Sequence, residues 1–518
     1  MRIELLNKCT LAVAVVVILA HGPFLFSKAG SADAQAGGRV PTVGDDHGYQ
    51  KLAINFMAGY GYTDSHVLPL EAYQVDLSTP WGRDALDRQA RQGLERPAYD
   101  FIRAPGLPML LAASYAVFGK RTIVARQAMA ALLLLTAILL VLLGATAGTP
   151  GIVAGFVSGL YHLHFFPGTH DFVRILTELP AACLVVLFCA LFTLYTTGRQ
   201  SALIPAALAM ASAVLTRVNL ASAALFLTLY LVIWRRQIRD GLIFTVVVGA
   251  PLLIWSIYAS QVVARPVLLS TQGAELFAMT NNIDTLEGIG PHRWNQGGWN
   301  PGFVLLQDGS IDNTNSHVPK AGENGWMMGF RFLRHHWQAI PKLLYVKLRV
   351  GFWFNDGSSA NWLRPERLHL MGIGFLLLGV GLRPSATSNS GRSRRLLLVQ
   401  LGLVLTLLFM LNKPFWIVLA IWCLIAAIAV SRPYGGAHQG PLHIPTWFLA
   451  FVLSHGLTTL VFYGTRMHHP LDPPLMYIAL LGLIVAFGEI WRFRAAISSS
   501  SDIFAAATHV SETHSVHI

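Results

Sequence analysis

The sequence predicts an all-α polytopic membrane protein. Of its 518 residues, 54% are hydrophobic and only 12% are charged, whereas a soluble globular domain usually carries about twice that charged fraction. Apolar runs such as 132–143 and 401–411 contain no ionisable side chain. Since a helix needs about 20 mostly apolar residues to cross a bilayer, we expect about 12 transmembrane helices. Two polar insertions are expected to form a cap on the outer side.

The distribution of basic residues predicts the orientation. The formal net charge is +12, but the sequence lacks the continuous basic stripe typical of nucleic-acid binding, so no such partner is expected. Arg and Lys gather instead in short loops beside apolar runs, at 235–239, 383–395 and 492–494. Cytoplasmic loops are enriched in these residues. Both polar insertions are therefore expected on the extracytoplasmic side.

The first half of the chain is expected to begin with a helix near 9–27. We expect this helix to stay attached, although Ala32-Asp33-Ala34 also has the form of a signal-peptidase site. An extracytoplasmic loop at 28–104 follows. The apolar stretch 105–118 is too short to span and is interpreted as a helix at the outer interface. Spans are then predicted near 122–144, 151–167, 175–196, 202–217, 219–234 and 242–261.

The second half contains the other polar insertion, at 262–340, followed by an amphipathic stretch near 341–354. The Ser-, Thr- and His-rich tail at 498–518 is expected to be disordered and cytoplasmic. Everything up to residue 490 is therefore interpreted as one integral-membrane domain. The remaining spans are predicted near 367–382, 396–411, 414–431, 446–463 and 474–491.

Cysteine and histidine spacings do not predict a metal site. The four cysteines form no CxxC pair and lie in apolar stretches, so we interpret them as small buried residues. Histidines gather near 162–170 and at 468–469. Because no familiar zinc-ligand spacing is present, we interpret these histidines as interfacial side chains.

An acidic pair in the first outer loop is the clearest candidate for chemistry. Asp45 and Asp46 precede residues at helical spacing, which are Tyr49, Leu52, Ala53, Phe56 and Met57. The two carboxylates are therefore expected at the N-terminus of an amphipathic helix. Adjacent carboxylates near a membrane surface can act as a general base or hold a divalent cation. The alternative interpretation is a solvated turn.

Eight short motifs follow one another along the chain. They are Asp45-Asp46-His47-Gly48-Tyr49, Gly59-Tyr60-Gly61-Tyr62, Arg103-Ala104-Pro105-Gly106-Leu107-Pro108, Arg126-Gln127, Thr177-Glu178-Leu179-Pro180, Leu215-Thr216-Arg217, Thr280-Asn281-Asn282 and Gly464-Thr465-Arg466. Their order resembles that of the GT-C glycosyltransferases, in the bacterial branch related to protein O-mannosyltransferases and to lipid A aminoarabinose transferases. The resemblance extends over most of residues 1–490. The sequence departs from it at Asp46, where the family often has Glu, and at Met467, where it has Tyr.

The resemblance implies transfer of a sugar from a polyprenyl-phosphate donor, in bacteria usually on undecaprenyl phosphate. Transfer would invert the anomeric centre at the outer face of the inner membrane, with a glycan, lipid or protein hydroxyl as acceptor. Such a reaction needs a carboxylate that takes the acceptor proton and cations that stabilise the leaving phosphate. The one possible cofactor is a divalent cation, which the acidic pair could bind.

The resemblance assigns the base to Asp45, with Asp46 and Glu178 as further acidic residues of the site. Arg103 is the best phosphate partner, because a guanidinium can engage two phosphate oxygens at once. Glu178 has an alternative role as a cap at the N-terminus of its helix, and Arg217 and Arg466 have one in snorkelling to lipid headgroups. The further substrate-binding candidates are Tyr49, Arg126, Arg217 and Arg466.

Three other functions are kept as alternatives. A polymerase or ligase of lipid-linked saccharides would use related chemistry, and a scaffold would use none. A transporter or flippase would need charged or broken helices near the bilayer midplane, whereas the acidic residues concentrate in the outer loops. The sequence also shows no internal repeat, which counts mildly against an inverted-repeat transporter.

Overall fold

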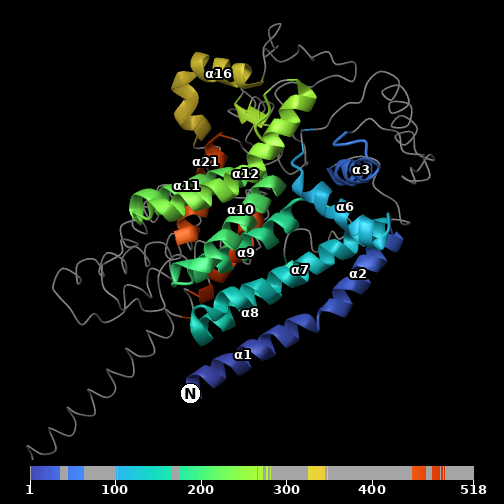
Figure 1. The fold of residues 1–518 in the computed structure, drawn as a ribbon, viewed down its shortest axis with the longest axis vertical. Helices are drawn as coiled ribbons and strands as arrows, with labels where there is room; N and C mark the ends of the chain where they lie inside the picture. Colours follow the sequence, from blue (N-terminus) through green and yellow to red (C-terminus); the bar gives the residue numbers. More distant parts are fainter. Residues whose placement is uncertain are drawn as a thin grey trace, which may run out of the picture. The chain divides into compact units, whose positions relative to one another are not determined.

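A computed structural model shows a helical chain (Figure 1). It divides into two compact units, Met1–Asn361 with Pro445–Pro474 and Trp362–Ile444 with Leu475–Ile518, and nearly all described residues belong to the first unit. The residues that the structure describes are 2–35, 45–63, 101, 103–165, 175–264, 266–271, 273, 276–277, 280–281, 325–344, 347, 446–461, 469–478, 480–481 and 484.

Within the described residues, four helical segments are long and apolar enough to cross a membrane, which fits a polytopic membrane protein. These are Glu4–Gln35, Thr122–Ala145, Glu178–Thr196 and Ile238–Val263. Shorter apolar helical segments cover Gly106–Phe118, Gln200–Thr216 and Val218–Trp234. The spans expected near 367–382, 396–411 and 414–431 lie outside the described residues, as does more than half of 474–491.

The N-terminal helical segment is longer than expected. It consists of α1 (Arg2–Leu19) and α2 (Gly22–Gln35), so it runs beyond residue 27 into the stretch expected to be loop. The physical reason is that Ala29 and Ala32 are buried in a core with Ala130 and Leu133, and these small side chains let α2 pack against the next long helix. Cys9 on α1 is exposed, which contradicts its interpretation as a buried residue, while Cys183 and Cys189 are buried.

Helices α7 (Thr122–Ala145) and α8 (Gly148–Phe165) form a tightly packed hairpin, and Figure 1 shows them side by side. A Cβ added at Gly151 would lie 2.1 Å from the carbonyl oxygen of Gly144, and one at Gly155 would lie 2.3 Å from that of Leu140. Small residues let helix backbones approach this closely, as is typical of helix pairs in membranes.

The rest of the described bundle follows the expected order. Helix α10 packs against α9 and α12, and α21 packs against α11. Two side-chain contacts tie α21 to this bundle. The indole of Trp447 donates to the hydroxyl of Thr193 at 2.9 Å, and the hydroxyls of Ser222 and Ser454 lie 2.7 Å apart. The bounds are α9 (Glu178–Thr196), α10 (Leu203–Thr216), α11 (Ala221–Leu229), a π-helical turn (Tyr230–Trp234), α12 (Ile238–Val263) and α21 (Thr446–Val461).

Three helices lie outside the expected spans. They are α3 (Asp45–Met57), α6 (Gly106–Phe118) and α16 (Gly325–His335). Helix α6 matches the expected short helix. The expected amphipathic pattern of α3 is only partly right, because Phe56 is 45% exposed while Gln50 and Asn55 are buried. Packing on both sides explains this difference. Tyr49 faces a core with α6 and α7, and Leu52 faces an aromatic core with Tyr62 and Trp255.

Candidate functional site

The acidic turn lies at the start of α3. The helix begins at Asp45, as the sequence predicts. Asp46 is buried at 8% exposure, and the side chain of Asp45 lies outside what the structure describes. Carboxylates in the first helical turn interact favourably with the exposed N–H groups there.

Arg103 lies directly against this turn. A Cβ added at Gly48 would come within 2.4 Å of the Cζ atom of Arg103, so the guanidinium occupies the space that any other residue at position 48 would fill. The same Cζ lies 5.6 Å from the centre of the Tyr49 ring, within the range of a cation–π contact. Arg103, Tyr49 and the acidic turn, which were singled out separately in the sequence, are thus brought together.

The side chain of Tyr62 holds the backbone of Arg103 in place. The Tyr62 hydroxyl lies 3.0 Å from the carbonyl oxygen of Arg103 and 3.1 Å from that of Ala104, and donates to this pair. The Tyr62 ring packs edge-on against Trp255, with centroids 4.9 Å apart, and beside Phe101, with centroids 5.5 Å apart. Tyr62 of the Gly-Tyr-Gly-Tyr motif therefore helps to fix the position of Arg103.

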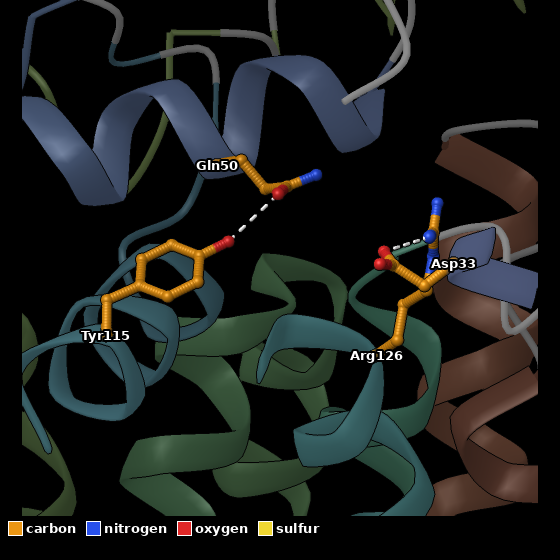
Figure 2. Close-up of polar contacts among 4 residues, drawn as sticks. All are labelled: Asp33, Gln50, Tyr115 and Arg126. Carbon is orange, nitrogen blue, oxygen red and sulfur yellow. Dashed lines mark hydrogen bonds and ion pairs between the residues drawn. The ribbon is translucent and has the colours of Figure 1, made fainter. Parts of the chain in front are cut away.

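Arg126 lies on α7 and is completely buried, at 0% exposure. Its Nη1 atom donates to the carboxylate of Asp33 at the end of α2, as Figure 2 shows. Asp46 is close enough to attract the same guanidinium. Among the described residues, Nε and Nη2 of Arg126 have no hydrogen-bond partner. Arg126 is thus a buried cation between the acidic residues of two other helices.

Gln50 and Tyr115 form the polar contact next to Arg126 in Figure 2. The Tyr115 hydroxyl donates to Oε1 of Gln50 at 2.9 Å, joining α6 to α3. Burial raises the pKa of Tyr115, so its hydroxyl keeps its proton and acts as the donor. This contact ties α3 to α6 about one helical turn after the acidic pair.

Glu178 and Arg217 form an ion pair, with Oε1 and Nη1 3.1 Å apart. Glu178 is the first residue of α9, and Arg217 directly follows α10. Their side chains are 7% and 13% exposed. The pair lies close to the start of α6, because a Cβ on Gly106 would be 2.3 Å from the hydroxyl of Thr216. The two residues that the sequence analysis proposed separately are therefore neighbours.

One apolar core holds these elements in register. It contains Tyr49 of α3, Leu111 of α6 and Ala125 of α7, with Leu179 of α9 packed against it. Tyr49 is itself a candidate of the site, Ala125 precedes Arg126, and Leu179 follows Glu178. Side chains fixed by shared packing keep their geometry better than side chains on free loops. The acidic turn, Arg126 and Glu178 are consequently anchored to the same core.

Two charged residues that the sequence analysis did not single out make polar contacts inside the described bundle. One is Asp33, whose role was hidden inside the Ala32-Asp33-Ala34 pattern. The other is Lys347, at 0% exposure, whose ammonium donates to Oδ1 of Asn281 at 2.7 Å and to the Val461 carbonyl at 3.3 Å. Burial lowers the pKa of Lys347 to about 7. A charged residue next to an apolar stretch was the available signal for both.

Metal binding and the last outer loop stay as sequence predictions. Among the described residues, no group of three or more His, Cys, Asp or Glu side chains could hold a metal ion. This finding does not test the acidic pair, because the side chain of Asp45 is not among the described residues. Arg466 also lies outside the described residues.

Comparison with known proteins gives two likenesses. A model of the uncharacterised protein family UPF0014 matches residues 380–488, a stretch that lies mostly outside the described residues. No curated protein sequence matches this chain significantly. The crystal structure of ArnT from Cupriavidus metallidurans bound to undecaprenyl phosphate is similar at 15% sequence identity and a TM-score of 0.35, covering 92% of this chain and 78% of that one. A TM-score this low does not establish a shared fold.

Proposed function

We propose that this chain is a membrane glycosyltransferase that moves a sugar from a polyprenyl-phosphate donor, such as undecaprenyl phosphate, to an acceptor hydroxyl. The observation that carries the proposal is the contact between the Arg103 guanidinium and Gly48 in the acidic turn. The guanidinium that we assign to phosphate binding thus lies against the helical turn that contains Asp45 and Asp46. The motif order that resembles GT-C glycosyltransferases adds to this geometry.

The chemistry divides between the acid and the cation. The acceptor oxygen attacks the anomeric carbon, the bond from that carbon to the phosphate oxygen breaks, and the configuration inverts. The polyprenyl phosphate leaves with the bonding electrons, and Arg103 stabilises its charge through charge-assisted hydrogen bonds. The proton of the acceptor hydroxyl goes to Asp45, the base in this proposal.

The remaining candidates have supporting roles in the proposal. Asp46 is buried and attracted by Arg126, so we assign it to holding the turn rather than to proton transfer. Tyr49 orients Arg103 through its ring. Arg217, which is paired with Glu178, and Arg466 of the last outer loop are assigned to binding the donor phosphate.

The proposed site lies on the extracytoplasmic face of a bacterial inner membrane. The proposal includes about 12 spans in a membrane domain over residues 1–490, a cap made by 28–104 and 262–340, and a cytoplasmic tail at 498–518. Labelling of Ser65→Cys and Ser310→Cys with an impermeant thiol reagent tests the orientation. Both should react in intact cells, and reaction only after lysis would contradict it.

The decisive experiment is Asp45→Asn. Asparagine keeps the size and hydrogen bonding of aspartate but cannot take a proton, so donor binding should persist while transfer falls by about 10²–10⁴, the usual contribution of a general base. Membranes are assayed with a panel of radiolabelled undecaprenyl-phosphate sugars. Asp46→Asn is the matched control and should be milder. If both are severe and a chelator reproduces the loss, the pair holds a cation instead.

Near-normal turnover of Asp45→Asn would remove the assignment of the base. Two alternatives have their own outcomes in the same assay. Movement of the labelled donor across the membrane without transfer would indicate a flippase or transporter. Consumption of diphosphate-linked oligosaccharides rather than monophosphate sugars would indicate a polymerase or ligase.

A further inference from the structure

We infer that α16 is a membrane-interface helix, whose exposed apolar face enters the headgroup region of the bilayer and whose basic residues bind the phosphates of anionic phospholipids. This surface is separate from the proposed transfer site on α3 and does not depend on that function. Its occupant is the lipid surface at the end of α21.

The exposed face of α16 is strongly apolar. Met327 and Phe330 are 56% and 60% exposed, and Trp337, in the 3₁₀ turn that follows, is 65% exposed. Trp326, one turn before Phe330, is 37% exposed. The opposite face is buried, with Phe332 packed together with Leu343. Large apolar side chains gathered on one face of a helix are typical of a surface that meets a membrane or a partner.

The contacts of α16 connect it to the end of a predicted span. The rings of Trp326 and Phe330 have centroids 4.8 and 4.9 Å from that of Phe277. One turn later, the amide of Asn281 reaches the carbonyl oxygen of Val461 at 3.5 Å. Val461 is the last residue of α21. Helix α16 is therefore separated from the end of α21 by a single short segment.

A span ends where the hydrocarbon meets the headgroups, so a helix one layer beyond it lies at interfacial depth. Tryptophan and other aromatic side chains are enriched at this depth. Amphipathic helices lie there with the apolar face inward and basic residues among the headgroups.

The charges on α16 favour lipid over a protein partner. Arg334 and His335 are exposed at the end of the helix, and Lys342 is exposed in the segment that follows. The described part of α16, Gly325–His335, contains no acidic residue. A basic rim beside an aromatic face complements anionic phospholipid. This charge pattern, and the continuity with α21, are why we commit to a lipid surface.

Spin labels at single cysteines test the proposal in the full-length chain. Met327→Cys and Phe330→Cys are compared with Gln338→Cys, an exposed polar position in the 3₁₀ turn, after the native cysteines have been replaced and folding has been checked. In nanodiscs containing phosphatidylglycerol, labels at 327 and 330 should collide with oxygen more than with a water-soluble nickel chelate. The label at 338 should show the reverse.

Two results would overturn the proposal. Labels at 327 and 330 as accessible to nickel as the label at 338 would place the face in water. Labels hidden from both reagents would mean that protein covers it. Phosphatidylcholine nanodiscs supply the second arm, because replacing the anionic lipid should reduce the immersion of the label at 330. Arg334→Gln should remove this difference in immersion between the two lipids. An unchanged difference would refute the phosphate contact.

Hydrogen exchange of the unmodified chain keeps the test independent of cysteine replacement. Peptides from 325–335 should exchange several-fold more slowly in anionic than in zwitterionic nanodiscs. Peptides from α7 serve as the internal control and should not change. Equal exchange of 325–335 in the two lipids would count against the proposal.

Discussion

The ion pair between Asp33 and Arg126 makes a sharp prediction about stability. Arg126 is fully buried, and the side chain of Asp33 is 17% exposed, so Asp33→Asn leaves a guanidinium in the interior with less compensation. Removing one partner of a buried pair typically costs about 3–5 kcal/mol in the free energy of unfolding. Because Asp33 is partly exposed and Asp46 still attracts Arg126, we expect about 3 kcal/mol, the lower limit of that range.

A double-mutant cycle isolates the pair from its surroundings. Asp33→Asn, Arg126→Gln and the double variant are unfolded in detergent micelles, and their free energies of unfolding are compared. If the charges interact directly, the double variant should be more stable than the sum of the single losses predicts, by about 1–3 kcal/mol.

The matched control is the ion pair of Glu4 and Lys8, whose atoms are 2.8 Å apart and whose side chains are both 71% exposed. Exposed pairs contribute about 0–1 kcal/mol, so Glu4→Gln should change stability very little. Additive losses in the cycle, or an Asp33→Asn effect as small as that of Glu4→Gln, would refute the reasoning.

Three further predictions follow from close contacts and burial. Gly48→Ala should displace the Arg103 guanidinium, whose Cζ would be 2.4 Å from the new Cβ, and so raise the donor KM as far as Arg103→Ala does while the fold stays intact. Gly106→Ala should cost about 1–3 kcal/mol by overpacking, measured by thermal unfolding, since the new Cβ meets the backbone nitrogen of Thr216 at 2.8 Å. The pKa of Lys347 is lowered to about 7, and unfolded lysine titrates at about 10.4, so between these values the unfolded state binds more protons. The free energy of unfolding should therefore rise with pH across this window by up to about 1.4 kcal/mol per unit. Lys347→Met should flatten this rise in denaturant titrations.

Hydropathy was sufficient to predict three of the four long helical segments in the described part of the chain, while the N-terminal segment extends beyond its expected end. The spans expected near 122–144 and 242–261 correspond to α7 and α12 within a few residues, because an apolar run of this length has few alternatives to a membrane helix. The start of α3 at Asp45 was also predicted, since an acid before a periodic apolar pattern is a local signal.

Contacts between distant segments could not be predicted from one sequence. Asp33 and Arg126 are 93 residues apart, and the sequence analysis interpreted them separately, Asp33 as part of a cleavage-like pattern and Arg126 as a substrate-binding candidate. Glu178 and Arg217 were both singled out, but their pairing depends on how α9 packs against α10. The burial of Gln50 similarly depends on Tyr115 of α6, which supplies its partner.

The position of Asp33 also bears on how the chain enters the membrane. An arginine in a spanning helix disfavours insertion, by about 2.5–3.5 kcal/mol at the helix centre and less toward the ends. Arg126 is in the second turn of α7, and its partner lies on a helix that is synthesised earlier. By the time α7 leaves the ribosome, the carboxylate that neutralises its arginine has already been delivered. We therefore expect the insertion efficiency of α7 to depend on Asp33, a residue 93 positions upstream.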